Sequence, residues 1–334
     1  MEKTISALMK QKVDLDAEFK KIIEISTEKK IRPFEDKFAS PEYLELVRKT
    51  NDESEAMLKS YYEYDLNLHG PEHFSKENVY VWGGPTPSWG GSMVKDASIK
   101  AKEYFGVDNV MYVYGPLNDE MLAIHRNCKK VICHLGRNCR TEGAAMQSDA
   151  EEAETLSRMS LKYPNIVGGV VDDMVGNYGT NYSRKEYKAI YDSLHKHNPN
   201  LELYGVIYSW ELDQVNVIKA VSECIDHIIL WFWKKTALTE IDLAVEKCRS
   251  LFPGKPIMLG IFMFDYGAAC LPNSPETMHY HLEKARRFLA AGKIQDMVIL
   301  GDREIEKCPD AAVYIQDFLK KEFAHSDPEF GGRH

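Results

Sequence analysis

Carboxylate side chains follow several apolar runs of this 334-residue sequence, at positions where strands would end. These residues are Asp172, Asp173, Glu211, Asp265, Asp302 and Glu304. Two carboxyl groups about 5–10 Å apart across a pocket can cleave a glycosidic bond, one protonated as the acid and the other ionised as nucleophile or base. We therefore predict that Asp173 (or Asp172), Glu211 and Asp265 are catalytic, and that Glu304 orients the substrate.

All five tryptophans fall at the same strand ends or in the loops directly after them. They are Trp82, Trp89, Trp210, Trp231 and Trp233. Flat aromatic rings suit the C–H face of a sugar ring, so we predict that these residues bind substrate, together with His134, Tyr208 and Tyr266. The alternative is that a tryptophan fills the top of a barrel, because this side chain is usually buried. Trp231 and Trp233 are two residues apart and face the same side of their strand.

The elements that must position these residues are eight apolar runs that alternate with amphipathic stretches. The runs are 79–83, 109–115, 130–136, 165–174, 201–212, 225–233, 256–267 and 294–302. Nearly continuous apolarity is typical of parallel strands that are buried on both faces. Eight strand–helix units over about 245 residues predict an α/β fold, a (β/α)8 TIM barrel, with its active face at the carboxyl ends of the strands. No Gly-x-Gly-x-x-Gly fingerprint follows the first run, which argues against a doubly wound sheet.

The chain divides into three predicted parts. Residues 1–78 form a helical extension with helices near 1–30 and 40–63, packed on the flank or the N-terminal face of the barrel. Residues 79–323 form the catalytic barrel, and residues 324–334 a flexible tail. Within the barrel, helices are expected over 183–197, 239–252, 275–291 and 310–323, two of them capped by Ser183 and Ser274.

Only one of the two adjacent aspartates can point into the barrel from a regular strand, because neighbours alternate faces. Asp173 shares its face with Val171 and Gly169. A small glycine beside larger residues is common inside barrels, so we expect Asp173 to face inward and Asp172 to cap the following segment.

The run 168–174, Gly-Gly-Val-Val-Asp-Asp-Met, resembles the strand-four motif of (β/α)8 glycoside hydrolases, in which glycine and branched residues precede an acid. This resemblance implies acid residues on strands four and seven, which Asp173 and Asp265 match in position. In the chitinase-like version of the motif, Val175 stands where the acid glutamate would be and Val171 where a further aspartate would be.

Composition excludes several classes of protein. The chain has 42 Lys and Arg against 51 Asp and Glu, a net charge of −9, so it lacks the basic surface of a nucleic-acid binder. No apolar run approaches a membrane span, and the N-terminus does not resemble a secretory signal. Seven cysteines, an odd number, are expected to be reduced thiols of a cytoplasmic protein. Cys128, Cys133, His134 and Cys139 lack the short C-x2-C pairs of zinc sites, so no metal or other cofactor is expected.

These patterns predict a cytoplasmic hydrolase of carbohydrate metabolism, a glycosidase that acts on a short oligosaccharide or glycoside by carboxylate acid/base catalysis. Its partner is a small carbohydrate, not a nucleic acid or a membrane. The acidic extension either forms a homodimer face or covers the barrel. Two alternatives stay open: a metal-dependent sugar isomerase, epimerase or lyase using the same carboxylates, and a non-catalytic carbohydrate-binding barrel.

Overall fold

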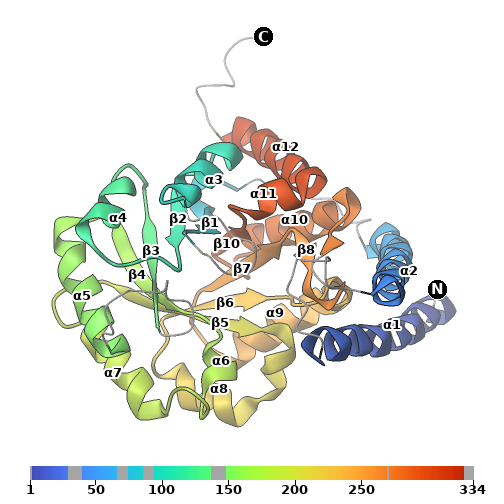
Figure 1. Ribbon diagram of the computed structural model, residues 1–334, viewed down its shortest axis with the longest axis horizontal. Helices are drawn as coiled ribbons and strands as arrows, with labels where there is room; N and C mark the ends of the chain where they lie inside the picture. The colour runs from blue at the N-terminus through green and yellow to red at the C-terminus, as the bar shows by residue number, and fades with distance from the viewer. Residues whose placement is uncertain are drawn as a thin grey trace.

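Eight parallel strands close into a barrel in the order β1-β10-β7-β6-β5-β4-β3-β2 (Figure 1). The computed structural model describes residues 2–28, 40–65, 74–85, 94–136, 148–268 and 271–326. The strands are β1 (Val79–Gly83), β2 (Asn109–Tyr112), β3 (Val131–Leu135), β4 (Ile166–Val171), β5 (Glu202–Tyr208), β6 (His227–Trp231), β7 (Ile257–Phe262) and β10 (Asp296–Leu300). The predicted (β/α)8 barrel is confirmed.

The strands form from the apolar runs because both of their faces are buried. Every residue of β1, β2, β3, β6 and β7 is buried, as expected when helices cover the outside and side chains fill the lumen. Seven of the eight predicted runs are longer than their strands. The excess arises because apolar residues just beyond the strand ends, such as Phe232 and Met263, are buried as well.

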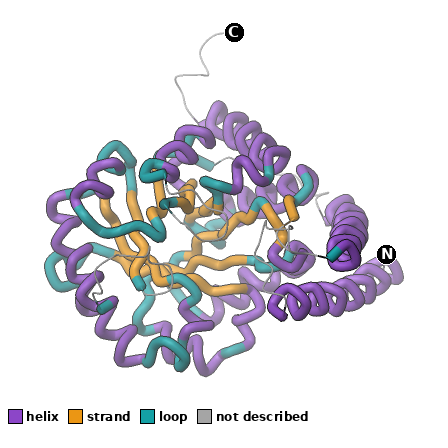
Figure 2. The backbone as a smooth tube through the Cα atoms, viewed as in Figure 1, coloured by secondary structure: helices purple, strands orange, loops and turns teal. Residues whose placement is uncertain are grey.

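Helices surround the strands (Figure 2). They are α3 (Ala97–Phe105), α4 (Asp119–Ile124), α5 (Asp149–Lys162), α7 (Arg184–Leu194), α8 (Val215–Ser222), α9 (Ile241–Leu251), α10 (Pro275–Ala290) and α12 (Pro309–Ser326). Ser183 and Ser274 cap α7 and α10 as predicted, since each hydroxyl accepts a backbone N–H of the first turn, from Glu186 and Thr277. Of the predicted tail, residues 324–326 belong to α12, and 327–334 lie outside the described residues.

The N-terminal extension consists of α1 (Glu2–Glu28) and α2 (Pro41–Asp65), which pack against each other. One flank contact agrees with the prediction: Tyr62 of α2 stacks on Tyr280 of α10, with ring centroids 4.1 Å apart. Of the two predicted alternatives, the flank is observed and the N-terminal face is not, because the pair reaches the loops at the carboxyl ends of the strands instead. Asp16 of α1 accepts a hydrogen bond from Thr236, which follows β6, at 3.2 Å. Polar groups on these loops supply hydrogen-bond partners for the charged side chains of the extension.

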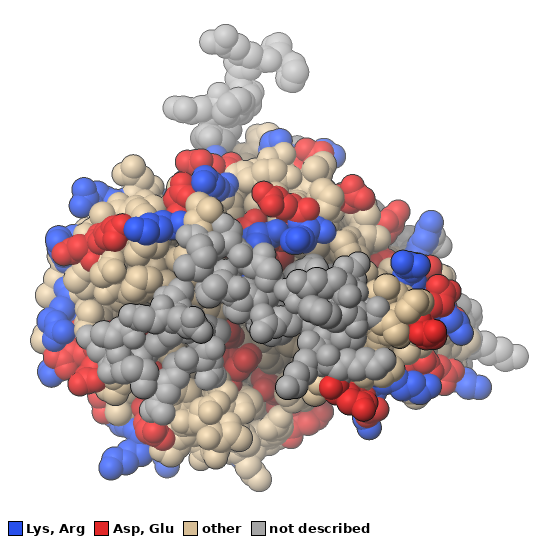
Figure 3. Space-filling view, in the orientation of Figure 1, with Lys and Arg blue, Asp and Glu red and all other residues tan. Residues whose placement is uncertain are grey.

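No helix in the described part of the chain is long and apolar enough to cross a membrane. Acidic and basic side chains are mixed over the face seen in Figure 3, and acidic groups are visible in the hollow near its middle. The five described cysteines are free and buried, and Cys139 and Cys270 lie outside the described residues.

Candidate active site

A pocket of about 950 Å³ lies at the carboxyl ends of β4, β5 and β6, with α1 as one wall. Its volume is near the upper end of the roughly 300–1,000 Å³ that small-molecule sites enclose. Among its lining residues, Asp173, Tyr208, Trp210, Glu211 and Trp233 come from the barrel, and Lys12, Asp16 and Ile23 come from α1. Five site residues were predicted at the ends of β5 and β6, and all of them except Trp231 line the pocket. The pocket also includes α1, which was not predicted to belong to the site.

Asp172 and Asp173 leave the end of β4 in different directions. Gly169 faces the surrounding helices, because a Cβ atom there would lie 2.4 Å from Leu135 and 3.4 Å from Leu156 of α5. The prediction that Asp173 faces inward together with Gly169 is therefore wrong, and strand alternation puts Asp172 on the lumen side. Asp173 reaches the pocket because its backbone leaves strand geometry: its φ is 50°, at the start of the short helix α6 (Met174–Asn177).

Tyr208 links two of the carboxyl groups that line the pocket, those of Asp173 and Glu211. Its hydroxyl donates a hydrogen bond to Asp173 Oδ1 at 2.8 Å. Its backbone N–H donates to Glu211 Oε2, also at 2.8 Å. Tyr208 is the last residue of β5, and Glu211 follows in the 3-10 turn η3 (Ser209–Asp213), so a short turn brings the glutamate back over its own strand.

Burial controls the protonation of this pair. It raises the pKa of Glu211 to about 7, and the negative charge of Asp173 adds to the shift, while N–H donors from Tyr208 and Gly176 oppose it. Burial also raises the pKa of Asp173, and the Tyr208 hydroxyl opposes this shift by stabilising the ionised form. With a pKa of about 7, Glu211 can hold a proton near neutral pH, while the Tyr208 hydroxyl favours the ionised form of Asp173. Acid/base chemistry requires one protonated and one ionised group.

Asp172 belongs to a hydrogen-bonded chain on the lumen side. The Tyr114 hydroxyl donates to its carboxylate, and Trp82 Nε1–H donates to the Tyr114 oxygen at 3.3 Å. Burial and the neighbouring Asp173 raise the pKa of Asp172. Asp172 is not among the residues that line the pocket, so the predicted catalytic alternative to Asp173 lies behind the pocket surface.

The tryptophans divide into two kinds. Trp82 and Trp231 meet edge to face across the lumen, with ring centroids 5.8 Å apart, and are 4% and 2% exposed. These two residues follow the alternative prediction, in which a tryptophan fills the top of the barrel instead of binding substrate. Trp210, 56% exposed, and the half-buried Trp233 line the pocket instead. Trp89 lies outside the described residues.

Aromatic rings support the pocket wall at Trp233. Tyr266 stacks on Trp233, with centroids 4.0 Å apart and an angle of 11° between the planes. The ring of Tyr208 meets Trp233 edge-on at 5.3 Å and lies parallel to that of Trp210 at 6.1 Å. The structure thus brings Tyr208, Tyr266 and the two pocket tryptophans into one aromatic group.

The remaining predicted residues lie elsewhere. Asp265, at the end of the short strand β8 (Phe264–Asp265), is 1% exposed and does not line the pocket. Glu304 pairs with Arg303 at 2.5 Å beside a separate small cavity that Trp82 and Tyr114 also line. His134 is 7% exposed, with its ring 5.6 Å from that of Tyr114, and it too is absent from the pocket lining.

Sequence reasoning missed the contribution of α1 and the charges that surround it. Each lysine of the pocket lining is paired with an acid: Lys12 with Glu240 at 2.8 Å, Lys234 with Asp16 at 3.5 Å, and Lys247 with Asp213. The pocket end beside α1 is therefore close to neutral. No local signal could have identified these residues, because each pair joins segments that are distant in sequence.

Among the described residues, no three His, Cys, Asp or Glu side chains form a group that could hold a metal ion.

No protein-family model matches the sequence, and no curated protein matches it. Similar solved structures include glycoside hydrolases. The catalytic domain of a hyperthermophilic chitinase from Pyrococcus furiosus has a TM-score of 0.49 and 11% identity, over 76% of this chain and 99% of that one. A chitinase of family GH18 from Chromobacterium violaceum has a TM-score of 0.48 and 11% identity, over 74% and 84%.

A β-glucuronidase from Bacteroides uniformis has a TM-score of 0.43 and 10% identity, over 68% of this chain. This chain spans only 30% of that enzyme's length. At these identities and TM-scores, the similarities carry no argument about the activity of this chain. An argument about activity must come from the residues of its pocket.

Proposed function

We propose that this protein is a glycoside hydrolase in which Glu211 and Asp173 are the catalytic carboxyl groups. The observation that carries the proposal is that both line one pocket and are joined through Tyr208, which binds each of them at 2.8 Å. Hydrolysis of a glycosidic bond needs one protonated and one ionised carboxyl group on opposite sides of the scissile bond.

Glu211 takes the role of general acid, because its raised pKa of about 7 leaves it partly protonated at neutral pH. Asp173 takes the role of nucleophile or base, since the Tyr208 hydroxyl stabilises its ionised form. Tyr208 orients both groups through its hydroxyl and its backbone N–H.

The substrate that this pocket fits is a short oligosaccharide or glycoside. Trp210 and Trp233 offer ring faces for sugar rings, and a volume of about 950 Å³ leaves room beyond a single ring. Because the pocket lysines are all paired, a neutral sugar fits better than one with a carboxylate. We place the enzyme in cytoplasmic carbohydrate metabolism, with no cofactor, and keep a homodimer through the extension as a prediction.

The first experiment is a thermal-shift screen of mono- and oligosaccharides, each with EDTA and with Mg²⁺ or Mn²⁺. A ligand at about 100 times its Kd stabilises the folded state by roughly 2.7 kcal/mol, which is easily measured as a rise in melting temperature. A shift by a neutral saccharide in EDTA supports the proposal and identifies glycosides for a turnover assay. A shift that requires metal favours the isomerase, epimerase or lyase alternative, and no shift from any sugar withdraws the carbohydrate assignment.

Turnover by variants then tests the two carboxyl groups. Asp173→Asn and Glu211→Gln should each reduce kcat by about 10²–10⁴-fold while leaving the melting temperature close to that of the wild type. Glu202→Gln is the matched control, because Glu202 begins the same strand, β5, at the opposite end of the barrel, where it pairs with His227 at 3.0 Å. Full activity in both site variants would refute the assignment, and binding without turnover in the wild type would favour the non-catalytic barrel.

A further inference from the structure

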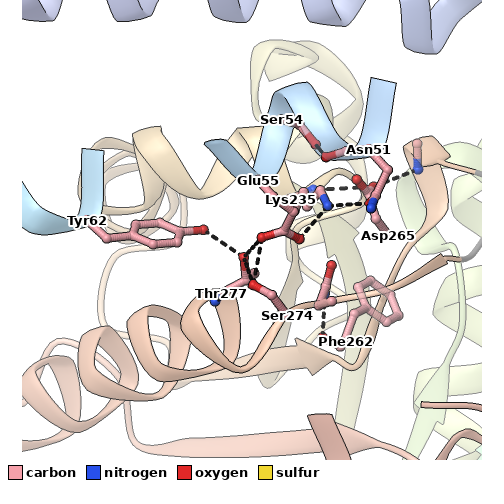
Figure 4. Close-up of polar contacts among 11 residues, drawn as sticks. Asn51, Ser54, Glu55, Tyr62, Lys235, Phe262, Asp265, Ser274 and Thr277 are labelled. Carbon is pink, nitrogen blue, oxygen red and sulfur yellow. Dashed lines mark hydrogen bonds and ion pairs between the residues drawn. The ribbon is translucent and has the colours of Figure 1, made fainter. Parts of the chain in front are cut away.

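A buried lysine connects the extension to the barrel directly beneath the pocket wall. The side chain of Lys235 is 0% exposed, and its Nζ donates hydrogen bonds to Glu55 Oε1 at 2.5 Å and to Asn51 Oδ1 at 2.6 Å (Figure 4). Glu55 and Asn51 belong to α2, whereas Lys235 begins the 3-10 turn η4 (Lys235–Glu240) that follows β6. A buried ammonium group requires such partners, so the position of Lys235 is tied to that of α2.

Glu55 is itself held from a second side. Its other oxygen, Oε2, accepts hydrogen bonds from Ser274 Oγ at 2.6 Å and from Thr277 Oγ1 at 3.1 Å, at the start of α10 (Figure 4). The hydroxyl of Tyr62 in turn donates to Thr277 Oγ1 at 3.3 Å. Glu55 is therefore fixed between α10 and Lys235, with little freedom to follow a displaced lysine.

Asp265 fixes the backbone at the same point. Its Oδ1 accepts the backbone N–H of Lys235 at 3.4 Å and that of Gly267 at 2.8 Å, which joins the loops after β6 and β7. Its Oδ2 meets no hydrogen-bond donor among the described residues, and burial raises the pKa of this carboxyl group. Asp265, predicted to be catalytic, is in a position to organise loops rather than to contact substrate.

The segment that this cluster holds is a wall of the pocket. Trp233, Lys234, Thr236 and Ala237 line it on either side of Lys235 in the chain. Tyr266, which lies between Asp265 and Gly267, stacks on Trp233 at 4.0 Å. Tyr266 is therefore adjacent in sequence to Asp265, and Trp233 is two residues from Lys235, so each member of the stacked pair lies close to the cluster formed by Glu55, Lys235 and Asp265.

We propose that Lys235 is a positioning residue for substrate binding, and that Glu55 makes the N-terminal extension a working part of the active site. In this arrangement, α2 sets the position of Lys235, and Lys235 and Asp265 set the orientation of the Trp233–Tyr266 pair against the sugar. The inference rests on the proposed function for the identity of the substrate. It adds that the N-terminal extension helps to position the substrate. A displacement of about 1 Å in a residue that orients substrate can cost on the order of 100-fold in rate, so small movements of this wall matter.

A second buried lysine, which also pairs with an acid of α2, provides a matched control. Lys284 of α10 is 6% exposed and pairs with Asp65 of α2 at 2.9 Å, and Asp65 is 24% exposed, against 23% for Glu55. The two ion pairs are thus similar in burial and both tie α2 to the barrel. Of these two pairs, only that of Lys235 and Glu55 joins α2 to the segment 233–237, whose residues line the pocket.

The test compares Lys235→Met and Glu55→Gln with Lys284→Met in the full-length protein. Amide hydrogen exchange of the unliganded protein should become faster over residues 233–237 and 265–267 in the first two variants and stay unchanged there in the third. With a glycoside found in the thermal-shift screen, Lys235→Met should raise KM by about 10-fold or more with a smaller change in kcat. Its pH–rate profile should keep the shape of the wild type, because no titrating catalytic group is lost, and Lys235→Arg should recover part of the binding.

Each outcome decides the inference independently of the proposed function. If the wild type cleaves no glycoside, the proposed function fails, and hydrogen exchange alone decides whether Lys235 positions the wall. Unchanged exchange over 233–237 in both Lys235→Met and Glu55→Gln overturns the inference, as does an equal rise in KM for Lys284→Met. If Lys235→Met does not fold, Glu55→Gln, whose one carbonyl oxygen can still accept from Ser274 and Thr277, carries the same two readouts.

Discussion

At neutral pH the carboxyl group of Glu211 lies close to its titration midpoint, because burial raises its pKa to about 7. Its side chain is 1% exposed, yet it borders the pocket, so a substrate can reach a group that bulk water scarcely solvates. Asp173 differs in receiving a hydroxyl hydrogen bond from Tyr208, which stabilises charge. Burial raises the pKa of both carboxyl groups, but only Asp173 accepts a hydroxyl hydrogen bond from the tyrosine that they share, and this bond opposes the shift.

This difference predicts a bell-shaped dependence of kcat/KM on pH. As pH rises through about 7, Glu211 loses the proton that the acid must supply, and activity falls. As pH falls through the raised pKa of Asp173, that group becomes neutral and activity falls again. In Glu211→Gln the alkaline limb should disappear from the residual activity. A limb near pH 7 that persists in this variant would belong to another group.

At the scale of elements, Trp231 of β6 fills the lumen in space that Gly260 of β7 leaves open. A Cβ atom on Gly260 would lie 2.1 Å from the indole ring, a distance that requires the ring or the strand to move. Trp231 also packs on Phe262 at 4.3 Å and on Trp82 at 5.8 Å, so the ring has no free direction in which to turn. The lumen is thus packed like a core, below the pocket.

Gly260→Ala should therefore destabilise the protein by about 1–3 kcal/mol, the usual cost of overpacking a core. Denaturant unfolding measures this change. The double variant Gly260→Ala/Trp231→Leu should regain part of the loss, since the smaller side chain frees the space. If Gly260→Ala is as stable as the wild type, Trp231 is not confined as described.

At the scale of the whole molecule, the extension completes a pocket that the barrel forms only in part. Ile23 of α1 lines the pocket and is 37% exposed, while Val13 of the same helix is 67% exposed and does not line it. The apolar anchors Leu15, Phe19 and Ile22 are buried and hold α1 in place. The extension therefore presents a fixed surface to the substrate.

Ile23→Asp should raise KM for an oligosaccharide by about 10-fold, the scale of losing an apolar contact in a pocket, and should affect a monosaccharide glycoside less. Val13→Asp is the matched control and should leave KM unchanged. Both changes are at exposed positions, so each should alter the free energy of unfolding by no more than about 0.5 kcal/mol. Equal KM values for Ile23→Asp and the wild type on every substrate would show that no substrate reaches α1.

The barrel, its eight strands, the caps at Ser183 and Ser274 and the strand ends at Asp173, Tyr208 and Glu211 were all predictable from the sequence. Each of these follows from local chemistry: continuous apolar runs require burial on both faces, and a serine hydroxyl satisfies a free N–H at a helix start. Only the tertiary structure decided which strand-end residues meet. Asp173 reaches the pocket through a left-handed backbone conformation, so the alternation of faces along a regular strand does not predict its direction.

The contacts of the N-terminal extension are the clearest example of a feature that depends on the tertiary structure. Glu55 and Lys235 are 180 positions apart in the chain, and the sequence around one residue does not indicate that it contacts the other. Hydrophobic periodicity records which side of an element is buried, but not which distant segment buries it. For that reason the helices of the extension were predictable from the sequence, but not that α1 forms one wall of the pocket.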